Sequence, residues 1–208
     1  MLHEHSYRLR CGFQKGEILM PDTDLVDISV ALPQVKIDLK YATADNITGR
    51  AIYLENRCLL HPNAVAALLQ SSRIAQLAGF TLLIYDAYRP QQAQQNLWLA
   101  CPDPDYVVPP GLGSNHCRGT AVDVTLVDNE GWIVDMGAGF DEMHPRSHAY
   151  HPAVPMQAQR HRLLLNAIMS GGGFCGIATE WWHFELPQAA SYPLLPEQFG
   201  CHPLKSGG

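Results

Sequence analysis

The feature that most constrains this chain is a carboxylate placed inside an apolar, strand-like run. Asp123 lies between Val122 and Val124, where the alternation of side chains along a strand can turn it toward the interior. An unpaired buried charge is costly, so the fold must give Asp123 a salt bridge, a cluster of hydrogen bonds or a metal ion. Taken alone, the residue favours the first two, because arginine or backbone donors satisfy most buried aspartates.

A second polar residue lies close to Asp123 in the sequence. His116 stands seven residues earlier, on a loop that contains Gly113 and Ser114 and leads into the same strand. Such a loop can fold back over the strand that it precedes. The pair suggests a metal site, although a single histidine on a loop is usually only solvated.

A third segment places polar residues among side chains made for burial. Residues 177–186 carry Glu180 and His183 on either side of two tryptophans, in a run typical of a core strand. Positions i and i+3 of a regular strand point to opposite faces. Both side chains therefore reach one centre only through a bulge, or if the strand ends near Trp182.

Two histidines and one carboxylate are a ligand set typical of a catalytic zinc ion. His116, Asp123 and His183 would occupy three positions of a tetrahedron and leave the fourth for water. Glu180 is three residues from one of these ligands and can serve as the base. From spacing alone this is a hypothesis, since Asp123 and His116 each have ordinary explanations.

Apolar periodicity predicts a mixture of helices and strands without regular alternation. Pro62 suits a first helical turn, and Pro90 begins a helix directly after a β-rich run, which puts Arg89 at a strand-to-helix junction. The pattern favours an α+β fold in which helices pack on a central, mainly antiparallel sheet. The expected strands are 35–41, 81–88, a hairpin over 119–136 and 176–186, and the expected helices are 62–79, 91–100 and 156–170.

Length and composition bear on domain organisation and on partners. The chain has 208 residues, of which 47% are hydrophobic and 16% charged. We expect one domain over residues 23–208, preceded by an N-terminal extension over residues 1–22 that lacks periodicity and can be flexible. A formal charge of −6 without a basic cluster argues against nucleic acid and membrane partners and leaves small molecules. Nothing in the sequence selects for or against a homo-oligomer.

Charged residues near the N-terminus determine which cellular location we expect for the protein. Arg8, Arg10, Lys15 and Glu17 interrupt each apolar run before it reaches the length of a signal-peptide core, and no run of about 18 apolar residues occurs elsewhere. We therefore expect a cytoplasmic protein. The six cysteines include no C-x-x-C pair and are expected to be mostly reduced thiols. Cys117 is a catalytic thiol or, by preference, a packing residue.

Two spacings in the sequence resemble those of a known family. They are Ser114-x-His116-x-x-Gly119-x-Ala121-x-Asp123 and Glu180-x-x-His183. Both are similar to the zinc D-Ala-D-Ala dipeptidases of the VanX type. The likeness includes residues 85–90, 139–143 and 146–148 and covers the chain from about 24 to 200, while residues 45–50 and 188–195 resemble the chromosomal enterobacterial branch of that family.

The resemblance implies a fold and a metal site. The fold would be the hedgehog and D,D-peptidase type of α+β structure. One zinc ion per chain would be held by His116, Asp123 and His183. Glu180 would act as the catalytic acid and base in the hydrolysis of the dipeptide D-alanyl-D-alanine to two D-alanine molecules.

The resemblance also implies roles around the metal. Arg89 would stabilise the tetrahedral intermediate. Ser114 would bind the carboxylate end of the dipeptide, and Asp141 would bind its free amine. Asn115 and Cys117 flank a ligand at positions that the family pattern leaves free.

Several alternatives remain open at this point. A D,D-carboxypeptidase acting on peptidoglycan stems would share the metal ligands but needs an open groove and usually an export signal. A non-catalytic zinc- or peptide-binding domain would have no need of Glu180 or Arg89. His148 and His151 are a conceivable second metal pair, yet their loop-like surroundings offer no third ligand. Asp86 is expected to belong to a hydrogen-bonded surface or loop network.

Overall fold

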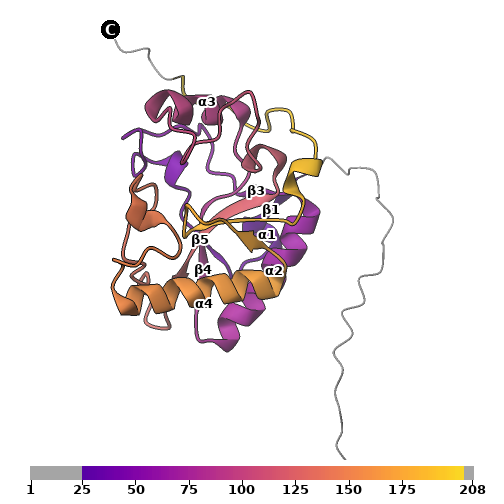
Figure 1. Ribbon diagram of the computed structural model, residues 1–208. Helices are drawn as coiled ribbons and strands as arrows, with labels where there is room; N and C mark the ends of the chain where they lie inside the picture. The colour runs from indigo at the N-terminus through magenta and orange to yellow at the C-terminus, as the bar shows by residue number, and fades with distance from the viewer. Residues whose placement is uncertain (1–24, 204–208) are drawn as a thin grey trace, which may run out of the picture.

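A five-stranded sheet runs through the middle of the molecule (Figure 1). The computed structural model describes residues 25–203, so the expected extension over 1–22 lies outside the described residues. The strand order is β2-β4-β5-β7-β6; β2 is parallel to β4, and every other neighbouring pair is antiparallel. The strands are β2 (Lys36–Ile37), β4 (Thr81–Asp86), β5 (Ala121–Val127), β7 (His183–Glu185) and β6 (Cys175–Gly176). The predicted mainly antiparallel sheet of an α+β fold is confirmed.

Helices flank this sheet, and a small second sheet lies beside it. Figure 1 shows α2 and α4 crossing at one end of the molecule and α3 at the other. The α-helices are α1 (Ile28–Ala31), α2 (Pro62–Leu77), α3 (Gln91–Ala100) and α4 (Met156–Gly172), and the second sheet is the antiparallel pair β1 (Val26–Asp27) and β3 (Leu59–Leu60). The three long helices confirm those predicted from periodicity. Among the described residues, no helix is long and apolar enough to cross a membrane.

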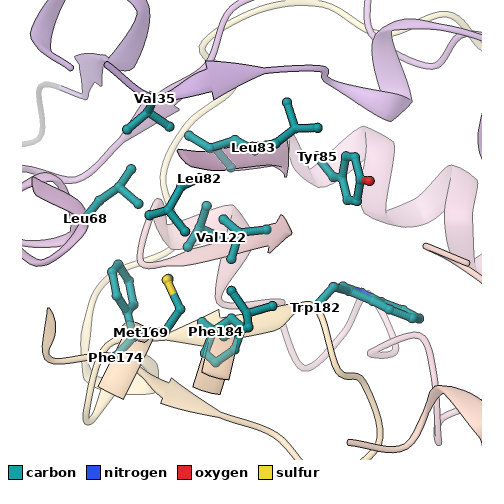
Figure 2. Packing of buried hydrophobic residues seen from close by; sticks show 14 of the residues in the cluster. Val35, Leu68, Leu82, Leu83, Tyr85, Val122, Met169, Phe174, Trp182 and Phe184 are labelled. Atoms are coloured by element: carbon teal, nitrogen blue, oxygen red, sulfur yellow. The ribbon is translucent and has the colours of Figure 1, made fainter. Parts of the chain in front are cut away.

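The central strand β5 is buried on both faces. Its seven residues are all buried, and Val122 belongs to the main hydrophobic core whereas Asp123 faces the opposite side. Figure 2 shows Val122 between Leu82 of β4 and Phe184 of β7, with Met169 of α4 packed close by. Each such buried side chain contributes about 1.5–3 kcal/mol relative to exposure. The core thus fixes the strand and turns Asp123 to the other face of the sheet.

The predicted strand over 35–41 is wrong in its second half. Only Lys36–Ile37 pairs as β2, and the chain then turns into a short 3-10 helix, Lys40–Ala42. Leu39 and Tyr41 are 3% and 2% exposed, so their alternation reflects burial in a bent segment and not a continuous strand. The bend directs Tyr41 toward the site described below.

The predicted hairpin over 119–136 is confirmed only in its first limb. That limb is β5, while the return limb is reduced to an isolated bridge between Val127 and Ile133. The turn itself is held by the backbone nitrogen of Asp128, which donates to the carbonyl of Trp132 at 3.0 Å. Because the return limb is so short, the loop that follows it can run over the face of the sheet that carries Asp123.

The single strand predicted over 176–186 is also wrong. β6 ends at Gly176, β7 begins at His183, and Glu180 lies in the loop between them. The strand end near Trp182, which Glu180 and His183 need in order to reach one centre, is therefore present.

Gly172 permits the close approach of α2 and α4, and its substitution should destabilise the fold. A Cβ at this position would overlap Ser71 Oγ and lie 2.8 Å from the carbonyl oxygen of Ala67. We expect Gly172→Ala to lower the free energy of unfolding by about 1–3 kcal/mol, because two helix backbones would have to separate. Urea unfolding followed by circular dichroism measures this loss.

The neighbouring glycine provides the control. A Cβ at Gly171 would meet only the flexible tip of Ile74, so Gly171→Ala should cost less than Gly172→Ala. Equal losses in the two variants would contradict this account of the helix contact.

Candidate functional site

Neighbouring strands bring acidic and imidazole side chains to one end of the sheet. In the sheet register, Asp123 of β5 lies opposite His183 of β7 on one side and opposite Asp86 of β4 on the other. A bulge between Ile84 and Asp86 shifts the register there, as is common beside functional sites. His116 lies in the 3-10 helix that precedes β5. The pairing of β4, β5 and β7 and the 3-10 helix before β5 thus place these residues together.

Two ring nitrogens and one carboxylate oxygen face one another at short range. His116 Nε2 lies 3.1 Å from His183 Nδ1 and 3.3 Å from Asp123 Oδ1, and the latter two atoms are 3.1 Å apart. Tetrahedral zinc ligands with bonds of about 2.0–2.1 Å would be about 3.3–3.4 Å apart. Within residues 25–203, this is the one group of His, Cys, Asp or Glu spaced to hold a metal ion.

The outward nitrogen of each imidazole meets an acceptor. His116 Nδ1 lies 2.8 Å from the carbonyl oxygen of Ala87, and His183 Nε2 lies 3.1 Å from Glu185 Oε2. Each outward nitrogen can therefore carry the proton of a neutral ring, which leaves the inward nitrogen as an acceptor. Three buried acceptors that face one another repel unless a proton or a cation lies among them. These two imidazole nitrogens and one carboxylate oxygen, as electron-pair donors, fit a divalent metal ion.

The charge of Asp123 is supported by its neighbours. When protons and not a cation lie among the three atoms, burial raises the pKa of its carboxyl, but the protonated imidazoles of His116 and His183 lower it by more, so that the pKa lies well below its usual range. Asp123 is thus ready to act as an ionised ligand.

Glu180 stands beside this centre without belonging to it. Its Oε2 lies 3.9 Å from His183 Nδ1, and its side chain is 11% exposed. Burial raises the pKa of Glu180 to about 8. A carboxyl that is costly to ionise and lies next to a cation site is suited to exchanging a proton.

Arg89 lies between the end of β4 and the start of α3 and is fixed by the residues around it. Its Nε and Nη2 each lie 2.9 Å from Asp86 Oδ2, and its Nη1 donates to Gln94 Oε1 at 2.8 Å. The guanidinium also lies over the ring of Tyr41, 5.0 Å from its centroid, and its Nη2 lies 3.5 Å from Asp123 Oδ2. The arginine is 7% exposed, so its positive charge is held next to the ligands.

Asp141 faces the site from the loop after β5. The ring of the preceding Phe140 packs against Trp182, with centroids 5.4 Å apart. Tyr41 Oη donates to Asp141 Oδ1 at 3.0 Å, while the buried Oδ2 has no hydrogen-bond partner in the described part of the chain. Burial raises the pKa of Asp141 to about 7. An unsatisfied carboxylate oxygen of this kind calls for a donor from a ligand.

One cavity of about 380 Å³ collects these groups. Small-molecule sites range from about 300 to 1,000 Å³, so this cavity is small. Ser114 lies in its wall and is 4% exposed, with its Oγ accepting a hydrogen bond from the His116 backbone nitrogen at 3.2 Å. All seven residues singled out from the sequence line it: Arg89, Ser114, His116, Asp123, Asp141, Glu180 and His183.

Several residues of the site were not found from the sequence. Tyr41 and Gln94 lay in segments read only for their periodicity, and Glu185 was read as part of a core strand. Asp86 is hydrogen-bonded, as predicted, but it is 0% exposed and not at the surface. The sequence does offer one signal for Asp86: it is an acidic residue at the end of an apolar strand-like run, three positions before Arg89.

Among the described residues, no cysteine and no histidine other than His116 and His183 belongs to the metal-spaced group. Burial raises the pKa of the Cys117 thiol to about 11, and Cys117 does not line the cavity, which supports the packing role. His148 and His151 belong to no metal-spaced group in residues 25–203. The cysteines of the described part are free: Cys58, Cys101, Cys117, Cys175 and Cys201.

Comparison with known proteins assigns the chain to a family. It is 70% identical over 179 residues to the D-alanyl-D-alanine dipeptidase of Escherichia coli K12 (86% of this chain, 93% of that protein). It is 34% identical to the D-alanyl-D-alanine dipeptidase of Streptomyces coelicolor (79% and 92%). The solved structure of VanYB in complex with D-Alanine-D-Alanine superposes with a TM-score of 0.43 and 15% identity (81% and 88%), and the assignment does not depend on it. Residues 21–205 match the model of the peptidase family M15, described as D-ala-D-ala dipeptidase, and the chain belongs to this family.

Proposed function

We propose that this chain is a zinc-dependent dipeptidase that hydrolyses D-alanyl-D-alanine to two molecules of D-alanine. One observation carries the proposal: three metal-spaced ligands, a separate buried carboxyl and a fixed arginine line one small cavity. The relatives named D-alanyl-D-alanine dipeptidase support the choice of substrate. A cytoplasmic location remains a prediction.

The metal would be held by His116, Asp123 and His183, one ion per chain. When bound, zinc would polarise the scissile carbonyl and lower the pKa of water toward neutrality. The outward hydrogen bonds of the two imidazoles, to Ala87 and Glu185, hold the rings in the tautomer that such an ion requires.

Glu180 would move the proton during hydrolysis. As a carboxylate it accepts a proton from the attacking water and then donates that proton to the nitrogen of the departing D-alanine. A cation at the neighbouring ligands favours the ionised form of Glu180, which burial alone disfavours. The same residue thus acts first as base and then as acid.

Arg89 would stabilise the negative charge that develops on the carbonyl oxygen. It is always protonated, and its donors are oriented before substrate arrives. A preorganised donor of this kind contributes about 3–4 kcal/mol to lowering a barrier.

Asp141 and Ser114 would bind the two ends of the dipeptide. The unpartnered Oδ2 of Asp141 suits the substrate ammonium group, and Ser114 would contact the carboxylate end. A carboxylate that captures a free amine rejects peptides extended at that end. A D,D-carboxypeptidase on peptidoglycan stems needs the opposite, an open end for the longer chain.

Blocking the substrate amine should therefore abolish most turnover. We expect kcat/KM for N-acetyl-D-Ala-D-Ala to be at least about 100-fold below that for D-Ala-D-Ala, because the buried Asp141 would lose its ionic partner. D-alanine release by the metal-loaded protein measures both values, with L-Ala-L-Ala as a stereochemical control. Equal values for the free and acetylated dipeptides would favour the carboxypeptidase, and no release from D-Ala-D-Ala would refute the proposal.

Removing the proton carrier should spare the metal. Glu180→Gln keeps the shape of the side chain, so we expect one zinc ion per chain with kcat lowered by about 10²–10⁴-fold. Metal analysis and steady-state kinetics on the same preparation test this. Retained activity would mean that another group is the base, and lost zinc would make Glu180 a ligand.

Weakening the support of His183 should lower zinc affinity. In Glu185→Gln the acceptor for His183 Nε2 loses its charge, and we expect zinc to bind about 10-fold more weakly. Competition with a chromophoric chelator measures the dissociation constant. The exposed Glu55→Gln is the matched control, and the same affinity in both variants would remove Glu185 from the metal site.

A further inference from the structure

We infer that Gln94 is a positioning residue that sets the plane of the Arg89 guanidinium and ties it to the cavity wall. This inference rests on the proposed function. Gln94 is 2% exposed on α3, five residues after Arg89, and lines the cavity. A buried amide needs partners for both its oxygen and its nitrogen, and the partners of Gln94 are informative.

The hydrogen bonds from Arg89 to Asp86 leave the guanidinium able to rotate about one oxygen atom, and Gln94 restricts that rotation. A single oxygen, Asp86 Oδ2, accepts from both Nε and Nη2 of Arg89, because Asp86 Oδ1 is taken by the hydroxyl of Tyr53 at 2.6 Å. A fork that closes on one oxygen can pivot about it, whereas a fork on two oxygens cannot. The Tyr41 ring and Asp123 Oδ2, 3.5 Å from Nη2, also contact the guanidinium, but Gln94 Oε1, 2.8 Å from Nη1, is the partner that holds its third nitrogen.

The other half of the same amide reaches the cavity wall. Gln94 Nε2 donates to the carbonyl of Val108 at 2.7 Å. Val108 belongs to a connection between α3 and the 3-10 helix of His116 that contributes Tyr106, Val107 and Leu112 to the cavity lining. One side chain therefore links the wall that encloses the substrate to the arginine that meets its reacting carbonyl.

Helix α3 makes this link stiff. The backbone nitrogen of Gln94 donates to the carbonyl of Pro90 at 3.1 Å, so the residue lies in the first turn immediately after Arg89. Its neighbour Gln95 is exposed. The two glutamines share a helix and a residue type but differ in their contacts, which makes Gln95 a matched control.

Substitution of Gln94 should reduce turnover more than substrate binding. We expect Gln94→Met, which removes both hydrogen bonds at similar volume, to lower kcat on D-Ala-D-Ala about 10-fold or more, since a hydrogen bond to a charged group is lost. KM and zinc content should change less than about 3-fold, and Gln95→Met should match the wild type. Gln94→Glu keeps an acceptor for Arg89 but turns a carboxylate oxygen toward the Val108 carbonyl, so it should recover only part of kcat.

A double-mutant cycle separates positioning from a purely structural effect. In an Arg89→Ala background, Gln94→Met should change kcat by less than about 2-fold, because the residue through which it acts is gone. An undiminished effect in that background, or a change in KM alone, would overturn the assignment. If Gln94→Met does not fold, Gln94→Asn withdraws the same contacts and takes its place in the cycle.

These outcomes are distinct from failure of the proposed function. A wild-type protein that does not cleave D-Ala-D-Ala refutes that function, and the assignment of Gln94 falls with it. An active wild type with an undiminished Gln94 effect in the Arg89→Ala background refutes only the assignment.

Discussion

The structure depends on the mutual approach of three buried acceptor atoms. His116 Nε2, His183 Nδ1 and Asp123 Oδ1 lie within 3.3 Å of one another, an arrangement that costs free energy unless positive charge joins them. Strand pairing and the core hold them there, because Asp123 and His183 are partners in the register of β5 and β7. Hydrophobic packing on one face of the sheet thus holds a charged centre in place on the other face.

Around this centre one arrangement recurs, in which a side chain of the site is held by a hydrogen bond or ion pair to a neighbouring residue. His183 is held by Glu185, and Glu185 also accepts from Asn115 Nδ2 at 2.9 Å. That last bond joins the segment of His116 to the strand of His183. Asp141 is held by Tyr41, and Arg89 by Asp86 and Gln94. Groups fixed before substrate arrives need little reorganisation during reaction, which is how electrostatic catalysis gains its advantage over water.

Much of this fold could be predicted from sequence because its signals are local. Each long helix begins at a proline or directly after one, and β4 and β5 are mostly apolar runs. The segment 35–41 could not be predicted in the same way, since buried side chains on a bent chain produce the same alternation as a strand. The loop that carries Glu180 was hidden by its tryptophans, which are buried although both lie outside β6 and β7.

The seven candidate site residues were found from their type and spacing together with the family resemblance, and the structure gathers them around one cavity. Their supporting residues could not be found, because hydrogen bonds such as those of Tyr41 to Asp141 and Gln94 to Val108 join segments whose proximity only the fold creates.

The most direct test of the account is anomalous diffraction at the zinc edge from crystals loaded with one equivalent of zinc. The account predicts one site, about 2.0–2.2 Å from His116 Nε2, Asp123 Oδ1 and His183 Nδ1, with no protein atom in the fourth position. Zinc bound elsewhere, or a fourth protein ligand closing the tetrahedron, would contradict it.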